Sequence, residues 1–181
     1  MNTRVKGFIY LLLSAVYFGF MPLLVKVICA DGSTIVGALF LRFALAIIPL
    51  YIYLKVRKVP MGVSMEDEKK ILCVTVFGYG ITALLLYSAY DYMPSGMATV
   101  IHFGYPVFVL LGSLIFLRRR VPKLKIVCVG LCMIGIFLSY AGSGGEAKLM
   151  GFVFALISGM TYAFYILYLE VGGLQDIPAM K

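Results

Sequence analysis

The apolar run at residues 95–117 carries nearly all of its polar side chains on one face of the helix that it would form. At about 100° per residue, these side chains fall within an arc of about 60°. They are Ser95, Thr99, His102, Pro106 and Ser113. Because Pro106 has no N–H to donate to the carbonyl of His102, the pattern predicts a kink and a free acceptor beside an imidazole.

A stripe of this kind suits the non-covalent binding of a polar solute in a hydrated cavity. Thr99 and His102 are then candidate contacts for the solute, and Pro106 is a structural residue. In the alternative interpretation, His102 forms a hydrogen bond to a neighbouring helix and the proline only shapes the packing. The sequence leaves both interpretations open.

Two other apolar runs carry matching stripes of aromatic and hydroxyl side chains. The stripes are Tyr10, Ser14, Tyr17 and Met21 in residues 7–29, and Phe154, Ser158, Thr161 and Tyr165 in residues 150–169. Such a surface suits a mixed polar and apolar metabolite, through stacking, hydroxyl hydrogen bonds and cation–π contact. We therefore expect Ser14, Tyr17, Thr161 and Tyr165 to contact a solute, although helix packing explains the same pattern.

Small residues four positions apart also recur in these two runs. Ala15 and Gly19 in the first run correspond to Gly159 and Ala163 in the second. Pairs of this spacing let helix backbones approach closely in lipid. The pattern predicts two close-packing faces, with Gly19 as a structural residue.

Arg42 lies near the middle of the apolar run 33–54, where an unpaired arginine costs about 2.5–3.5 kcal/mol. No carboxylate is expected at the same depth, so helix-end carbonyls or cavity water are the expected partners. A structural clamp is the favoured interpretation of Arg42, and binding of a substrate carboxylate is the alternative.

The composition requires a membrane to solvate these runs. Hydrophobic residues make up 62% of the chain, charged residues 13%, and the mean hydropathy is +1.02. Runs long enough to cross about 30 Å of hydrocarbon lie near 7–29, 33–54, 71–90, 95–117, 124–141 and 150–169. The predicted fold is an all-α integral membrane bundle of six transmembrane helices.

Basic residues gather in alternate loops of this bundle. Lys and Arg cluster before residue 7, between 54 and 71, and between 117 and 126, whereas the opposite loops are mostly acidic. The positive-inside rule then places the N-terminus in the cytoplasm. The positive charge sets topology and favours contact with lipid head groups, so no nucleic-acid partner is implied.

The beginning of the chain recurs 144 residues later. Between residues 7–23 and 151–167, six of seventeen positions are identical. Five crossings separate the two copies, so the repeat is inverted, which is how many secondary transporters are built. The expected organisation is a five-span repeat at 1–141, a loop at 142–149, and the incomplete start of a second, inverted repeat at 150–181.

At these positions the chain resembles the EamA-type drug/metabolite transporters, which have ten spans in two inverted halves. The matching motifs are Phe18-Gly19 with Lys26, Arg42-Phe43, Ala98 with Pro106-Val107-Phe108-Val109, Gly135-Ile136, and Gly151 with Ala155-Leu156 and Tyr162-Ala163. The chain departs from the family at Phe18, where the family has Trp, and at Arg118-Arg119-Arg120, where the family places a Glu. The resemblance implies a small organic solute as substrate and a location in a bacterial cytoplasmic membrane.

Three functions remain open. The sequence favours a secondary transporter that moves a small organic metabolite by alternating access, and it leaves proton or ion coupling open. The alternative is an inactive or partner-dependent fragment, which would need a dimer or the missing C-terminal half. An integral-membrane enzyme is least favoured, because there is one His and no two acids share an intramembrane face. No catalytic residue, metal site or cofactor is predicted.

Overall fold

A computed structural model describes residues 3–58, 64–118, 121–142 and 148–172. This part of the chain is all helical, and six of its helical segments are long and apolar enough to cross a membrane. The inter-repeat residues 143–147, the chain end at 173–181, and Arg119 and Arg120 lie outside the described residues.

Four of the six spans are single helices and two are interrupted. The single helices are α1 (Thr3–Ala30), α2 (Ile35–Val56), α7 (Lys123–Ala141) and α8 (Leu149–Val171). The third span consists of α3 (Met65–Cys73), the π-helical turn η1 (Val74–Gly80) and α4 (Ile81–Ala89). The fourth consists of α5 (Ser95–His102) and α6 (Tyr105–Ile115).

Five of these spans agree with the apolar runs to within a few residues, but the third begins at Met65 rather than near residue 71. The Ser64 side chain caps this helix by accepting a hydrogen bond from the Asp67 N–H at 3.1 Å. Acidic residues in the first turn suit the positive end of the helix dipole. Capping therefore extends the helix beyond its apolar part, which hydropathy alone does not detect.

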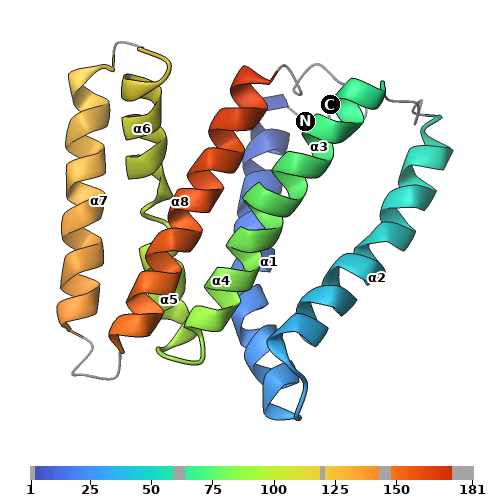
Figure 1. Ribbon diagram of the computed structural model, residues 1–181, viewed down its shortest axis with the longest axis horizontal. Helices are drawn as coiled ribbons and strands as arrows, with labels where there is room; N and C mark the ends of the chain where they lie inside the picture. Colours follow the sequence, from blue (N-terminus) through green and yellow to red (C-terminus); the bar gives the residue numbers. More distant parts are fainter. Residues whose placement is uncertain (1–2, 59–63, 119–120, 143–147, 173–181) are drawn as a thin grey trace.

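The last helix, α8, lies in the middle of the bundle and contacts η1, α4, α5 and α6 (Figure 1). Its buried face consists of the small residues Gly151, Ala155, Ser158, Gly159 and Ala163. Gly78 on η1 allows the two backbones to approach, since an added Cβ there would lie 2.9 Å from the Cβ of Tyr165. This close packing fixes α8 against the interrupted spans.

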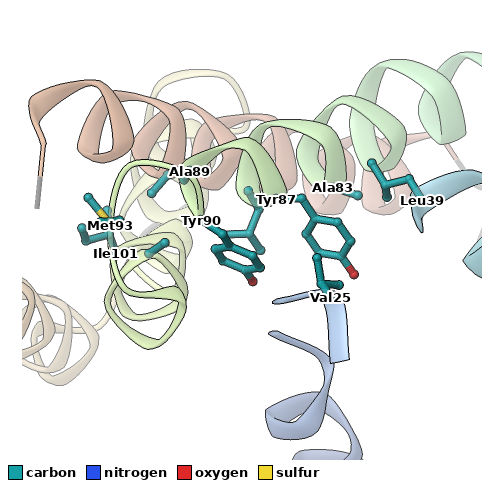
Figure 2. Packing of buried hydrophobic residues seen from close by; sticks show 11 residues of the cluster. Val25, Leu39, Ala83, Tyr87, Ala89, Tyr90, Met93 and Ile101 are labelled. Carbon is teal, nitrogen blue, oxygen red and sulfur yellow. The ribbon is translucent and has the colours of Figure 1, made fainter. Parts of the chain in front are cut away.

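The core continues from α4 through the following turn into α5. Figure 2 shows Tyr87 and Tyr90 projecting from this region toward the part of α1 that carries Val25. Leu39 of α2 reaches the same cluster. In contrast, α7 has no buried residue, and most large apolar side chains of α1 and α2 are exposed. The bundle therefore has a packed centre and peripheral helices whose apolar side chains are exposed.

The kink expected at Pro106 is present as a break in the fourth span. α5 ends at His102, and α6 begins at Tyr105 with Pro106 in its first turn. Between them, the Phe103 and Gly104 N–H groups donate to the carbonyls of Thr99 and Ile101. The break therefore places His102 at a helix end within the membrane-spanning segment.

Candidate functional site

A cavity of about 660 Å³ lies between α1, α2, α4, α5 and α8. Its α1 wall consists of Leu11, Ser14, Ala15, Phe18, Gly19, Met21 and Pro22. The opposite wall consists of Arg42, Tyr79, Thr82, Ala83, Leu86, Tyr87, Tyr90, Thr99, His102, Phe103, Tyr105 and Tyr162. The cavity thus has a largely apolar wall on one side, and a wall rich in hydroxyls with one cation and one imidazole on the other.

Arg42 points into this cavity and is held by two tyrosines of the third span. Its Nη1 donates to the hydroxyl of Tyr87, and its Nη2 donates to the hydroxyl of Tyr79 at 3.1 Å. The guanidinium carbon also lies 5.8 Å from the centre of the Tyr87 ring, within cation–π range. Among the described residues, phenols of the third span rather than helix-end carbonyls are therefore the partners of Arg42, which corrects that part of the expectation.

His102 is 3% exposed and lines the cavity from the break in the fourth span. Its Nδ1 lies 2.9 Å from the hydroxyl oxygen of Ser158. The Ser158 hydroxyl donates its own proton to the carbonyl of Ala155, at 2.6 Å, so its oxygen accepts from Nδ1–H. A neutral imidazole held in this way keeps Nε2 unprotonated, as a hydrogen-bond acceptor.

Thr99 and Tyr90 form a second polar pair in the wall. The Thr99 hydroxyl donates to the Ser95 carbonyl at 2.7 Å and lies 3.3 Å from the Tyr90 hydroxyl. Tyr90 lies in the turn after α4, and burial raises the pKa of its phenol to about 12. The phenol is therefore protonated at physiological pH, and its O–H donates to Thr99, whose own proton goes to Ser95.

Behind this wall, hydroxyl and aromatic contacts join the third span to α8. Thr82 and Thr161 share a hydrogen bond of 2.6 Å. The Tyr165 ring lies 5.8 Å from that of Tyr79 and is stacked on Tyr162 at 5.7 Å, between ring centres. These contacts fix the position of Tyr79, whose hydroxyl accepts a hydrogen bond from Arg42.

The structure brings most of the predicted site residues together, but not all of them. Ser14, Gly19, Arg42, Thr99 and His102 line the cavity. Pro106 shapes the break, and Thr161 and Tyr165 pack behind the wall. Tyr17 lies outside the cavity and is 74% exposed.

The two small-residue pairs have different surroundings. An added Cβ at Gly159 would lie 3.2 Å from the His102 carbonyl oxygen, and Ala163 is 2% exposed, so this face packs closely as expected. Gly19 has no heavy atom within 4 Å of an added Cβ, and both Ala15 and Gly19 line the cavity. None of the described helices covers the face of Ala15 and Gly19, so close packing at that face stays a prediction.

Sequence reasoning missed the tyrosines that make the wall polar, namely Tyr79, Tyr87, Tyr90, Tyr105 and Tyr162. One signal was available. A phenol deep in an apolar run needs a hydrogen-bond partner, and Arg42 in the neighbouring run needs acceptors at similar depth. Matching these two needs would have paired the second span with the third.

The arrangement can bind and orient a small solute without covalent chemistry. It offers N–H and O–H donors at Arg42 and the phenols, an acceptor at His102, and apolar surface on α1. Among the described residues, no three His, Cys, Asp or Glu side chains are placed to hold a metal ion. The four cysteines are free, and Cys128 and Cys132 are exposed on α7.

Comparison with known proteins gives a consistent family. Residues 5–141 match the EamA-like transporter family. An uncharacterized transporter of Clostridium kluyveri is 22% identical over 88% of this chain and 54% of its own length, and one of Archaeoglobus fulgidus is 28% identical over 88% and 56%.

The pseudopaline exporter CntI of Pseudomonas aeruginosa is 28% identical over 97% of this chain and 66% of its own length. The chain thus spans between half and two thirds of the length of these curated relatives. No solved structure matches it significantly.

Proposed function

Because the chain belongs to the EamA-like transporter family, we propose that it moves a small organic solute across a bacterial cytoplasmic membrane, with the cavity as part of the solute path. The observation that carries this proposal is the polar wall formed by Arg42, Thr99 and His102 inside membrane-spanning helices. Ionisable groups at such depth are costly, and in membrane proteins they commonly mark the path of a solute or an ion.

The contrast between centre and periphery suggests how access would alternate. The third and fourth spans and α8 are tightly packed, whereas α1 and α2 have few buried side chains. In the proposed mechanism, the packed spans hold one wall of the site, and α1 and α2 move against it. Motion of one bundle against another around a central site is how secondary transporters expose that site to each side.

A second proposal concerns the unit that transports. The face of α1 that carries Ser14 and Gly19 lines the cavity, and none of the described helices packs against it. Many apolar residues of α1 and α2 are also exposed. This observation favours a transporter that works only when further spans cover that face, supplied by a second copy or by another segment. Transport by the chain as a monomer, without further spans from a second copy or another segment, would contradict this second proposal.

Vesicle transport tests the first proposal. The chain, alone and as a longer product with added spans, is reconstituted into liposomes and screened for uptake of a panel of neutral, anionic and cationic metabolites. Thr99→Val and His102→Ala are expected to reduce uptake or change the solute profile, because both side chains line the cavity. Leu124→Ala is the control, since Leu124 is 74% exposed on α7, away from the cavity.

The result that contradicts the solute path is specific. If Thr99→Val and His102→Ala are stably inserted and transport the same solutes at the same rates as the wild type, the cavity is not the path. The N-terminus is proposed to be cytoplasmic, because α1 begins on the side of the bundle where α2 ends and α3 begins (Figure 1), and Lys55, Arg57, Lys69 and Lys70 belong to those two helix ends. Labelling of an introduced cysteine at residue 3 from outside intact cells would contradict this orientation.

A further inference from the structure

The cavity contains a positive charge without a matching acid. Among the described residues, the ion pairs are those of Lys70 with Glu66 and with Asp67, at the start of the third span. Arg42 instead contacts two neutral phenols and aromatic rings. Phenols satisfy hydrogen bonds but do not neutralise the charge, so the site has a net positive potential in a low-dielectric environment.

The same cluster also has more hydrogen-bond donors than acceptors. A guanidinium carries five N–H donors, and Arg42 uses one N–H on each of its two terminal nitrogens to reach Tyr79 and Tyr87. Because both phenols accept from Arg42, each still has its own O–H to donate, and the described residues provide no acceptor for either. N–H and O–H donors therefore converge on one place in the cavity wall.

We propose that Arg42, Tyr79 and Tyr87 form a carboxylate-binding site, and that the solute is an organic monocarboxylate. This inference rests on the proposed function and names the substrate class of the same cavity. A carboxylate has two oxygens that accept several hydrogen bonds and match the planar guanidinium fork, so it supplies both the charge and the acceptors that the cluster lacks. The phenol O–H groups then donate to the oxygens that Arg42 leaves free.

The rest of the cavity indicates the charge and shape of the solute. Arg42 is the one cation among the described residues that line the cavity, so a monoanion is matched better than a doubly charged phosphate. Phe18 on α1 and Phe103 at the helix break lie 5.7 Å apart between ring centres and cover the adjoining wall. This aromatic surface fits an apolar or aromatic body attached to the carboxylate.

Paired ligands test the inference on the unmodified protein. The chain in lipid nanodiscs is titrated with 3-phenylpropionate and with 3-phenylpropionamide, which differ in charge but have nearly the same shape. We expect the carboxylate to bind about 10- to 100-fold more tightly, as for hydrogen bonds to a charged group. Arg42→Gln should remove this preference, and Arg42→Lys should keep part of it because a charge remains without the planar fork.

Arg57→Gln is the matched control, because Arg57 follows the same helix but lies outside the cavity. It should leave the preference unchanged. Equal binding of acid and amide to the wild type would overturn the inference while leaving the proposed solute path intact. If neither probe binds the folded protein, the carboxylate site is also overturned, and the Thr99→Val and His102→Ala transport data still decide whether the cavity carries solutes.

Discussion

Helices α1 and α8 carry equivalent residues 144 positions apart, yet their equivalent faces have different surroundings. The buried face of α8 consists of Gly151, Ala155, Ser158, Gly159 and Ala163. The corresponding residues of α1 are Gly7, Leu11, Ser14, Ala15 and Gly19. All of these α1 residues except Gly7 line the cavity instead of packing.

The difference comes from the neighbours and not from the residues. η1, α4, α5 and α6 surround α8, so its small residues meet backbone and aromatic side chains. α1 contacts mainly α2 and α5, each much less extensively than α8 contacts its neighbours, and added Cβ atoms at Gly7 and Gly19 meet open space. A repeated face of small residues is therefore a packing surface where helices cover it and a cavity wall where they do not.

The largest expected effect separates two glycines that are equivalent in the repeat. Gly151→Leu should lower the free energy of unfolding by about 2–3 kcal/mol, because even an added Cβ would lie 2.8 Å from the Cβ of Tyr92. Gly7→Leu should have little effect, since nothing lies within 4 Å of its added Cβ. Unfolding by SDS titration in micelles, followed by circular dichroism, measures both. Equal losses for the two variants would show that the faces are packed alike.

The next effect concerns the two serines. Ser158→Ala removes the acceptor of the buried His102 Nδ1–H and should cost about 1–3 kcal/mol of unfolding free energy. Ser14→Ala removes an exposed hydroxyl and should change stability by less than about 0.5 kcal/mol. The same unfolding assay compares them. A stability loss at Ser14 as large as that at Ser158 would contradict the open position of the α1 face.

A smaller effect is expected at Thr161 and its repeat equivalent, Tyr17. Thr161→Val removes a hydrogen bond of 2.6 Å to Thr82 and should cost about 1 kcal/mol. Tyr17→Phe should change neither stability nor solute binding, because Tyr17 is 74% exposed and lies outside the cavity. Binding is measured by titration in nanodiscs. Weaker solute binding by Tyr17→Phe would restore Tyr17 to the site that the sequence predicts.

The smallest effect is a change in affinity without a change in stability. Gly19→Leu adds a side chain into open space beside the cavity, so we expect about threefold weaker solute binding, or less than 1 kcal/mol. The unfolding free energy should stay at the wild-type value. An unfolding free energy lowered as much as by Gly151→Leu would show that Gly19 is in a packed interface in the folded protein.

Hydropathy and helix-breaking chemistry were enough to predict the spans and the break. A hydrocarbon layer of fixed thickness imposes the span length, and proline removes one hydrogen bond at a known position. The break between His102 and Tyr105 and five of the six spans therefore lie where the sequence places them. The span length and the break at proline both depend only on residues that are close together in the sequence.

Contacts between helices could not be predicted in the same way. The partners of Arg42 are on another span, and the distance between Arg42 and Tyr87 depends on how α2 leans against α4. For His102, the hydrogen bond to a neighbouring helix is present and the residue also lines the cavity, so the two interpretations are compatible. Contact of His102 with a solute stays a prediction.

The π-helical turn η1 has a consequence for chain length. Its hydrogen bonds reach back one residue further than those of an α-helix, so it accommodates an extra residue between α3 and α4. Deleting one residue between Val74 and Gly80 would therefore let the span continue as a regular α-helix, with α3 in nearly the same phase relative to Thr82 and Tyr87. A homologue that is one residue shorter here would keep the same faces of α3 and α4 toward the bundle, whereas a deletion within α3 or α4 would turn the residues beyond it by about 100°.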